Sequence, residues 1–417
     1  MLPLDQRWYR RLIGAAIGLG IAGGVLSLVY LTATGVLIDW VFGSTDGTAW
    51  SGQWWWIPLT ASGALIVIYL RGKLSIVEHV PGGVQIIEAG GIDHASGVKW
   101  IGLAIISAVT GASLGPSFAL AVMGGSLGSW LADYRWPQDE ANQDYTLTGV
   151  AGGFGAAFTS PILAAFIVTE LAPTPRARYV AAIIPQLIAA TLGFIIYFSV
   201  FGRTFLGVYE LPNYQFEVLD MAIAVLLGVI SAIVMAVLVL IVMVVRQLAA
   251  LFTNRYVLGV IGGAAVGALA MALPLTLGAG QSQLETVLGS LTAWGVGFLI
   301  LVLIAKMVAL AVSLEIGFLG GNVFPMIFIG GLAGVIVSLL IPSIPPALAV
   351  SCMLAAVPGS YLRAPIGMTF IAAVAVALDP RTTAPVAVAV ITSYLLVASV
   401  RYALANRRSE PAGSVAT

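Results

Sequence analysis

Long apolar runs alternate with short polar segments along nearly the whole chain. Several runs are close to the roughly 20 residues that an α-helix needs to cross a bilayer, whereas others are clearly shorter or longer. Glycine and proline interrupt many runs, and such breaks are tolerated at membrane depth only where the freed backbone groups face protein or a polar cavity. The pattern therefore predicts broken and tilted transmembrane helices. The runs lie at 12–37, 57–70, 100–131, 147–171, 180–201, 221–245, 256–277, 293–314, 318–341, 347–353, 366–378 and 386–404.

Charged residues gather in the connecting segments, and segment 205–217 is the natural boundary between two halves of the chain. We predict a single polytopic transmembrane domain over 1–417. Its first repeat half is expected at 12–204 and its second at 218–405. A short polar tail is expected at 406–417.

One arrangement of glycines and prolines occurs twice, about two hundred residues apart. The first copy combines 111–116 with 151–170, and the second combines 320–325 with 355–375. In each copy a glycine-rich break ends in proline and leads into an apolar helix, and a second segment of small residues ending in proline follows some forty residues later. Duplicated broken helices in an apolar chain are typical of membrane transport folds. The predicted fold class is therefore an all-α integral membrane protein with two repeated halves, and the family resemblance described below implies that the repeat is inverted.

The composition excludes a soluble domain. Hydrophobic residues make up 60% of the chain and charged residues only 9%, whereas about a quarter of the residues of a soluble protein are charged. The formal net charge is zero, which gives no reason to expect a nucleic-acid partner. The two histidines, His79 and His94, are not joined by a cysteine or carboxylate cluster at ligand spacing. We expect neither a metal site nor a cofactor, and the lipid bilayer is the expected surrounding.

Arginines flank the apolar part of the chain at both ends. Because cytoplasmic segments carry an excess of Lys and Arg, both termini are expected in the cytoplasm, and the location is the cell membrane with several crossings. The arginines are Arg7, Arg10 and Arg11 before the first run and Arg401, Arg407 and Arg408 after the last.

The glycine-rich breaks have a consequence that suits anions. The first turn of a helix exposes unpaired N–H groups, and the helix dipole adds about half a positive charge at that end. Two such ends, after Gly111 and after Gly320, would converge on a dehydrated anion near the middle of the membrane. Glycine allows close approach of the backbone, and proline at a helix start loses no hydrogen bond. The alternative is that the glycines only allow close helix packing.

Four segments match the motifs of a known family. Segment 152–161 matches the motif G-x-x-A-A-F-x-x-P, which an acidic residue follows; the matching residues are Ala156, Ala157, Phe158, Pro161 and Glu170. Segment 321–325 is similar to G-x-F-x-P, with Phe one place later, and segment 111–116 is similar to G-K/R-E-G-P. Segment 81–85 lies at the place of G-S-G-I-P. Over about 71–405 the chain resembles the CLC family of chloride channels and proton-coupled chloride exchangers. The resemblance implies a CLC-like fold and a homodimer in which each subunit has its own anion pathway.

The chain also departs from this family at its side-chain ligands. The family's gating glutamate falls on Leu114, its anion-binding serine falls on Gly82, and the region that would supply a tyrosine hydroxyl reads Asp379, Pro380 and Arg381. Backbone N–H groups remain as the expected ligands, and they bind more weakly than a full set with hydroxyls. The candidate anion-binding residues are Gly82, Gly83, Ser113, Leu114, Gly115, Asn322, Val323 and Phe324.

Four further features bear on gating or proton movement. Leu114 cannot titrate, and by the resemblance Glu170 is the one proton station of the family that survives, or else a helix-end residue that merely faces water. Lys306 and Glu315 lie in or near the run that leads to Gly320. Lys306 adds positive potential and Glu315 is the candidate for a substitute gate, or each is bonded to backbone or extends to the membrane interface. Asn322 either donates to an anion or caps the helix that begins there.

The function predicted from these residues is passive, uncoupled transport of a small anion, with chloride as the default by resemblance. Fluoride, nitrate and bicarbonate are also compatible with a site lined by backbone. One alternative is proton-coupled exchange through Glu170 and Glu315, and another is a membrane scaffold that no longer transports. Segment 124–128 matches the nucleophile elbow of serine hydrolases, but no histidine follows Ser126 in the chain, so we do not expect an enzyme.

Overall fold

The computed structural model describes residues 2–43, 52–76, 80–136, 142–158, 160–175, 178–212 and 214–409. These ranges contain sixteen α-helices and short 3₁₀ turns, and the only β-type pairing within them is an isolated bridge between Gly115 and Gly321. His79 lies outside the described residues. The prediction of an all-α membrane fold is confirmed.

The helices fall into two series that are separated by the segment after Phe201. The first series is α1 (Arg7–Phe42), α2 (Trp56–Lys73), α3 (Gly83–Ala89), α4 (His94–Val109), α5 (Ser117–Arg135), α6 (Asn142–Ala157), α7 (Pro161–Leu171) and α8 (Tyr179–Phe201). The second is α9 (Leu219–Ala249), α10 (Arg255–Ala272), α11 (Gln281–Leu288), α12 (Val296–Glu315), α13 (Val323–Leu340), α14 (Pro346–Tyr361), α15 (Pro365–Ala375) and α16 (Pro380–Ser409), with η2 (Pro274–Thr276) and η3 (Leu291–Ala293) on either side of α11.

Glycine and proline break the apolar runs where the sequence predicts. The run at 100–131 is divided into α4 and α5, and the run at 147–171 is divided into α6 and α7. Pro161 and Pro365 each occupy the first turn of a helix, where the missing N–H of proline would have no partner in any case. The short helices α7 and α15 are therefore separate from the helices before them.

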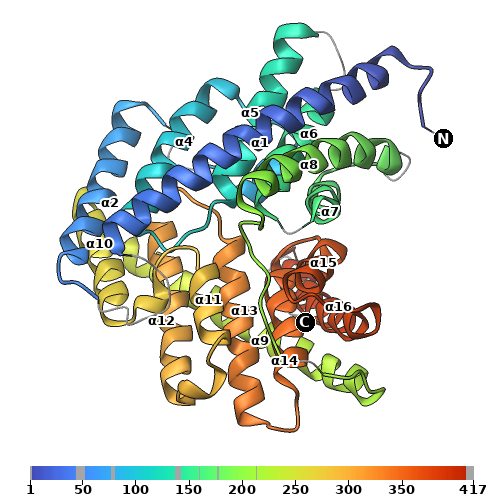
Figure 1. The fold of residues 1–417 in the computed structure, drawn as a ribbon. Helices are drawn as coiled ribbons and strands as arrows, with labels where there is room; N and C mark the ends of the chain where they lie inside the picture. Colours follow the sequence, from blue (N-terminus) through green and yellow to red (C-terminus); the bar gives the residue numbers. More distant parts are fainter. Residues whose placement is uncertain are drawn as a thin grey trace, which may run out of the picture.

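The two series are built on one packing pattern. In the first, α1 lies across α6 and α8, and α5 packs along α6 (Figure 1). In the second, α9 packs against α14 and α16, and α13 packs along α14. Contacts between α2 and α10 and between α7 and α15 join the series. The packing of the second series thus repeats that of the first, in agreement with the expected repeat fold.

The segment between the series crosses the middle of the molecule (Figure 1). The N–H of Leu206 donates to the carbonyl of Ala157 over 3.1 Å, and the N–H of Tyr209 donates to the carbonyl of Ala375 over 2.6 Å. These carbonyls lie at the C-terminal ends of α6 and α15, where a helix leaves its last acceptors without intrahelical donors. The segment therefore satisfies the end of one helix in each half.

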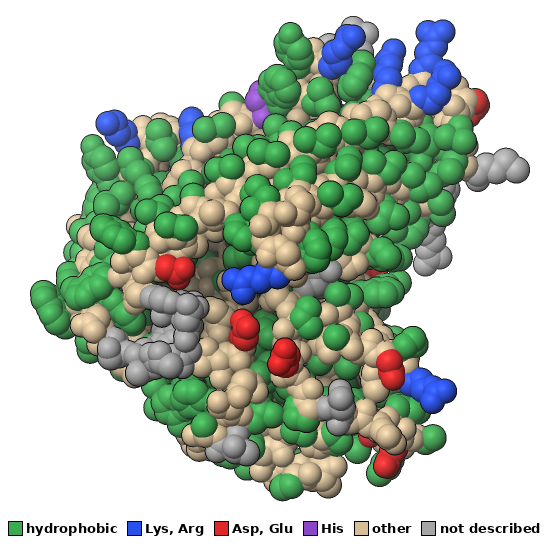
Figure 2. All heavy atoms as spheres, in the orientation of Figure 1, with side chains coloured by type: hydrophobic (Ala, Val, Ile, Leu, Met, Phe, Trp, Pro, Cys, Tyr) green, Lys and Arg blue, Asp and Glu red, His purple; other side chains and the backbone are tan. Residues whose placement is uncertain are grey.

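The outer surface is apolar over long stretches. Figure 2 shows hydrophobic side chains over much of one face, along the band where α1 and α8 lie, with Lys and Arg at its upper edge near the N-terminus. Seven described helices are long and apolar enough to cross a bilayer: α1, α8, α9, α10, α12, α13 and α16. The chain is a multi-pass membrane protein. Helix α16 continues to Ser409, so the first four residues of the expected polar tail are helical, and 410–417 lie outside the described residues.

Candidate functional site

The two glycine-rich breaks meet and pair with each other. The N–H of Gly115 donates to the carbonyl of Gly321 and the N–H of Gly321 donates to the carbonyl of Gly115, each over 2.7 Å. Before the bridge, Gly111 and Gly317 both turn the chain with positive φ, at 93° and 92°. This backbone region is open to glycine and strained for most other residues. The starts of α5 and α13 are thereby held side by side.

Two serine hydroxyl groups each accept a hydrogen bond from the backbone of the opposite break. The N–H of Leu319 donates to the Oγ of Ser107 over 3.0 Å, and the N–H of Ser113 donates to the Oγ of Ser313 over 3.1 Å. Each serine belongs to the helix that leads into the opposite break. Sequence reasoning missed this pair, although the pattern S-x-x-x-G-x-x-x-G, at 107–115 and again at 313–321, is its signal.

Several backbone N–H groups that the sequence analysis assigned to an anion form hydrogen bonds within the protein. The N–H groups of Ser113 and Gly115 are bonded as above, and that of Leu114 donates to the carbonyl of Ala112 over 2.8 Å. These three N–H groups are therefore not available to a ligand in this conformation. The Leu114 side chain is 5% exposed and packs on Gly320, where an added Cβ would lie 2.5 Å from the Cβ of Leu114.

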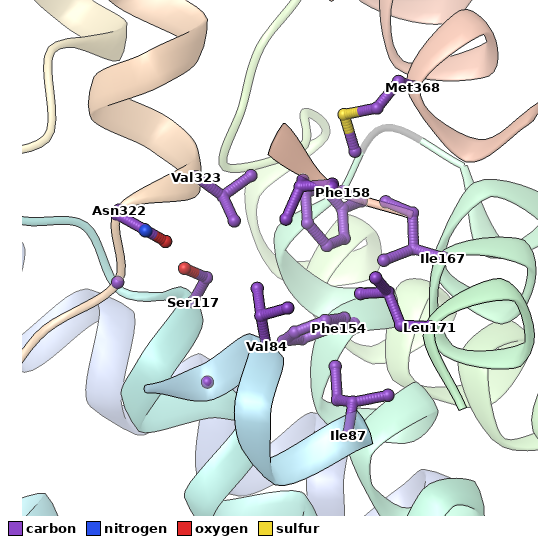
Figure 3. A pocket seen from close by; sticks show the side chains of 13 residues that line it. Val84, Ile87, Ser117, Phe154, Phe158, Ile167, Leu171, Asn322, Val323 and Met368 are labelled. Carbon is purple, nitrogen blue, oxygen red and sulfur yellow. The ribbon is translucent and has the colours of Figure 1, made fainter. Parts of the chain in front are cut away.

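A cavity lies beside the bridge, where α3, α5 and α13 begin (Figure 3). Its space for a water-sized sphere is about 20 Å³, enough for one such occupant. None of the described residues that line it is ionisable or a tyrosine. The lining residues are Gly83, Val84, Ile87, Ser117, Phe154, Phe158, Ile167, Leu171, Gly321, Asn322, Val323, Leu362 and Met368.

The first residues of three helices line this cavity. Gly83, Ser117 and Val323 are the first residues of α3, α5 and α13, and their N–H groups have no hydrogen-bond partner within the part of the chain that the structure describes. The unpaired N–H groups and the helix dipoles give this end of each helix a partial positive charge. Gly82, by contrast, donates its N–H to Gln85 Oε1 over 2.9 Å. The helix starts therefore make the potential in the cavity positive, with no charged side chain among the described residues of its wall.

Two residues, Ser117 and Asn322, supply the hydroxyl and carboxamide side chains among the described residues of the cavity wall. Figure 3 shows Ser117 and Asn322 on the same side of the cavity, with the Ser117 hydroxyl directed toward the Asn322 carboxamide and the apolar side chains opposite. Asn322 is the N-cap of α13, yet its side chain makes no capping hydrogen bond. The capping role that the sequence left open is therefore not taken up here, and the ligand role stays a prediction. Ser117 was not among the residues singled out from the sequence.

Glu170 binds the start of another helix. Its carboxylate accepts hydrogen bonds from the N–H groups of Ile366 and Gly367, over 3.1 and 2.7 Å, at the first turn of α15. A carboxylate at a helix N-terminus is stabilised by the free N–H groups and the dipole. Glu170 does not line the cavity, although Ile167 and Leu171 on the same helix do.

Lys306 and Glu315 also lie away from the cavity wall. The Lys306 side chain is 0% exposed, and its Nζ donates to the carbonyls of Thr276 and Gly278 over 3.0 and 2.6 Å. The Thr276 carbonyl also accepts from the Ser113 hydroxyl over 3.2 Å, so the ammonium group lies directly behind the first break. Glu315 pairs with Arg246, with 2.9 Å between Oε1 and Nε.

The geometry defines a class of protein. Helix starts meet around a small cavity without ionisable walls, in a bundle of broken membrane helices, and this arrangement favours a partly dehydrated anion over a cation. The chain belongs to the CLC family: the family model described as voltage gated chloride channel matches residues 88–398. The resemblance found in the sequence is confirmed, and the coarse function is CLC-type anion transport.

Curated relatives match at low identity. The chain is 25% identical to YfeO of Escherichia coli, provisionally named an ion-transport protein, over 404 residues that cover 94% of each chain. It is 27% identical to the uncharacterized protein MJ0305 of Methanocaldococcus jannaschii over 199 residues, which cover 47% of this chain and 49% of that protein. The match to MJ0305 therefore spans about half of each protein.

Solved structures share the fold over almost the full length. A slow cyanobacterial chloride/proton antiporter matches with a TM-score of 0.79 and 17% identity, covering 96% of this chain and 98% of its own. A CLC-type fluoride/proton antiporter matches with a TM-score of 0.77 and 18% identity, covering 93% and 95%. At this identity the likeness establishes the fold alone.

The hydrolase-like motif does not form a nucleophile elbow. Residues 124–128 lie inside α5, and no strand precedes them in the described chain. An elbow needs a strand-to-helix turn to expose its serine. Ser126 Oγ instead lies where a side chain on Gly97 would be, between α4 and α5. A packing role explains this serine, and the family consists of channels and transporters.

Proposed function

We propose that the protein moves a small anion, chloride by default, passively and without proton coupling. One observation carries the proposal: among the described residues, no ionisable side chain lines the cavity. Leu114, on which the family's gating glutamate falls by the sequence resemblance, packs on Gly320. Proton-coupled exchange needs groups that take up and release protons along the anion pathway. Leu114 cannot do so, and Glu170 is engaged at the start of α15.

Electrostatic stabilisation by helix starts is the proposed mechanism. Free N–H groups at the starts of α3, α5 and α13 would replace part of the hydration shell of the anion. Because few hydrogen bonds to the ion are available, binding should be weak, which favours release as much as entry. The homodimer implied by the family and the cytoplasmic position of both termini remain predictions.

Proton-coupled exchange is the second candidate. It is favoured by the position of Glu170, which lies in the sequence between two residues that line the cavity, and by the likeness of the fold to two solved proton antiporters. Glu315, the other residue considered for this role, is held by Arg246 away from the cavity.

Anion efflux from proteoliposomes separates these functions. Vesicles are loaded in turn with chloride, fluoride, nitrate and bicarbonate, and efflux is followed with a potassium ionophore, a proton ionophore, or both. Efflux that needs only the potassium ionophore supports uncoupled anion movement. Efflux that drives protons across the membrane contradicts the proposal and supports exchange. If none of the anions leaves the vesicles, a membrane scaffold is the better description.

Glu170→Gln is expected to leave anion efflux within about twofold of the wild-type rate. The amide keeps one acceptor oxygen for the start of α15 but loses the charge, so the free energy of unfolding should fall by about 1 kcal/mol. Thermal unfolding in detergent and efflux from vesicles measure the two effects. Proton uptake in the wild type that disappears in this variant would show that Glu170 carries protons.

Lys306→Met is expected to weaken the apparent affinity for the transported anion about tenfold. A unit charge roughly 10 Å from an anion contributes about 1–2 kcal/mol at an effective dielectric constant near 20. The variant also leaves the carbonyls of Thr276 and Gly278 without their donor, so thermal stability should fall as well. The dependence of efflux rate on anion concentration gives the affinity. Lys306→Arg, which keeps the charge, is the control, and equal affinity in all three proteins would exclude a role for this charge.

A further inference from the structure

We infer that Ser117 and Asn322 are the side-chain ligands of the transported anion, and that the site they form selects a monatomic halide over polyatomic anions. The inference rests on the proposed function. The family resemblance places the two side-chain ligands at Gly82 and near Asp379. Gly82 has no side chain, and the Asp379 carboxylate accepts a hydrogen bond from the backbone N–H of Thr382 over 2.7 Å. Ser117 and Asn322 supply hydroxyl and amide donors at other positions.

Ser117 is a buried hydroxyl placed for a ligand. The residue is 3% exposed, and among the described residues its Oγ has no hydrogen-bond partner, although it lies in the cavity wall. The hydroxyl is not among the fully enclosed side-chain atoms without a partner, so it borders the open space of the cavity and can donate a hydrogen bond to an occupant. The hydroxyl lies over Gly321, in the space that a Cβ at that position would fill. The glycine of the second break therefore makes room for the serine that follows the first.

Asn322 approaches the same place from the opposite half of the chain. It precedes the first residue of α13, so its side chain and the free N–H of Val323 open onto one space. A carboxamide has two N–H donors, and neither is needed by the helix that Asn322 begins. Ser117 and Asn322 thus add hydrogen-bond donors beside the backbone N–H groups of α5 and α13.

The remaining wall limits the size and chemistry of the ligand. Val84, Phe154 and Phe158 face the two polar side chains across the cavity, and they offer neither donors nor acceptors (Figure 3). The space suits one water-sized occupant. A spherical ion can accept several hydrogen bonds from one side while it rests on an apolar surface, whereas the outer oxygens of nitrate or bicarbonate would be pressed against that surface and left unpaired.

Bromide is the probe for the site itself. Crystals of the full chain grown in bromide are expected to give an anomalous peak within hydrogen-bond distance of Ser117 Oγ and of the Asn322 amide. A peak elsewhere, or none in the cavity, overturns the inference. This result is independent of transport, so it decides the position of the ligands even if vesicles show coupled exchange in place of the proposed passive flux.

Transport by variants gives the second test. Ser117→Ala and Asn322→Leu are each expected to weaken apparent chloride affinity about tenfold to a hundredfold, the factor that one hydrogen bond to a charged group contributes. Both should also reduce the preference for chloride over nitrate. Asn322→Asp, nearly the same shape but negatively charged, is expected to reduce flux further. Ser129→Ala, on the same helix but outside the cavity wall, is the control.

The outcomes of this test separate the inference from the proposed function. Uncoupled chloride flux with unchanged affinity in Ser117→Ala and Asn322→Leu leaves the function standing and overturns the inference. Coupled flux that both variants weaken, while Ser129→Ala does not, supports the ligands and contradicts passive transport.

Discussion

Gly321→Ala is expected to reduce anion flux more than tenfold and to lower the free energy of unfolding by about 1–3 kcal/mol, the usual cost of overpacking. The added methyl group would overlap Ser117 Oγ and lie 2.9 Å from the backbone nitrogen of Phe118. Backbone atoms at the start of a helix cannot move aside cheaply, so α5 and α13 must separate. Separation would break the Gly115–Gly321 bridge and open the cavity that it borders.

Gly102→Ala is the matched control for this change. Gly102 lies within α4, and a Cβ there would meet no atom within 4 Å. Alanine in an open helical position should be neutral or slightly stabilising. Efflux and thermal unfolding of both variants measure the effects. If Gly321→Ala transports and unfolds like Gly102→Ala, close contact between the two breaks is not required.

Leu114→Glu is expected to reduce anion flux at least tenfold at neutral pH and to restore it as the solution is made acidic. A carboxylate at this position would lie beside the bridge between the two breaks and compete with the anion for positive potential. Protonation removes the charge and with it the competition. Efflux is measured across a pH series, together with the thermal stability of the variant, because Leu114 is buried.

Leu114→Gln has nearly the shape of the glutamate variant without a titratable group. Its flux should be independent of pH and closer to that of the wild type. If the glutamate and glutamine variants show the same flux at every pH, position 114 does not lie on the anion pathway. Replacement of a gating carboxylate by Leu114 would then not explain uncoupled flux.

Helix breaks and their meeting point could be predicted from the sequence. Glycine and proline mark the break between α4 and α5 and the break between α6 and α7. Glycine adopts backbone angles that end a helix, and proline lacks the N–H that would continue one. The repeat of the pattern predicts that two helix starts converge. Which N–H groups stay free could not be predicted, because it depends on pairing across about two hundred residues between Gly115 and Gly321.

The hydrogen-bonding and ion-pair partners of the charged residues could not be predicted from the sequence either. Glu170 binds the start of α15 in the other half, and Glu315 pairs with Arg246 on α9. Lys306 binds carbonyls of η2 and the residues after it, one of the alternatives that its position in an apolar run leaves open. These contacts follow from tertiary packing, since the residues lie on different helices and no local spacing connects them. Ser117 was missed because a serine beginning a helix is ordinarily a capping or packing residue.

The reversal potential of the current through reconstituted protein tests the central claim most directly. The two sides of the membrane hold equal chloride and differ tenfold in proton concentration. Uncoupled anion movement predicts a reversal potential of zero, because the anion gradient alone sets it. A potential displaced from zero by the proton gradient would show that protons move with the anion, and would contradict the account of a pathway without titratable groups.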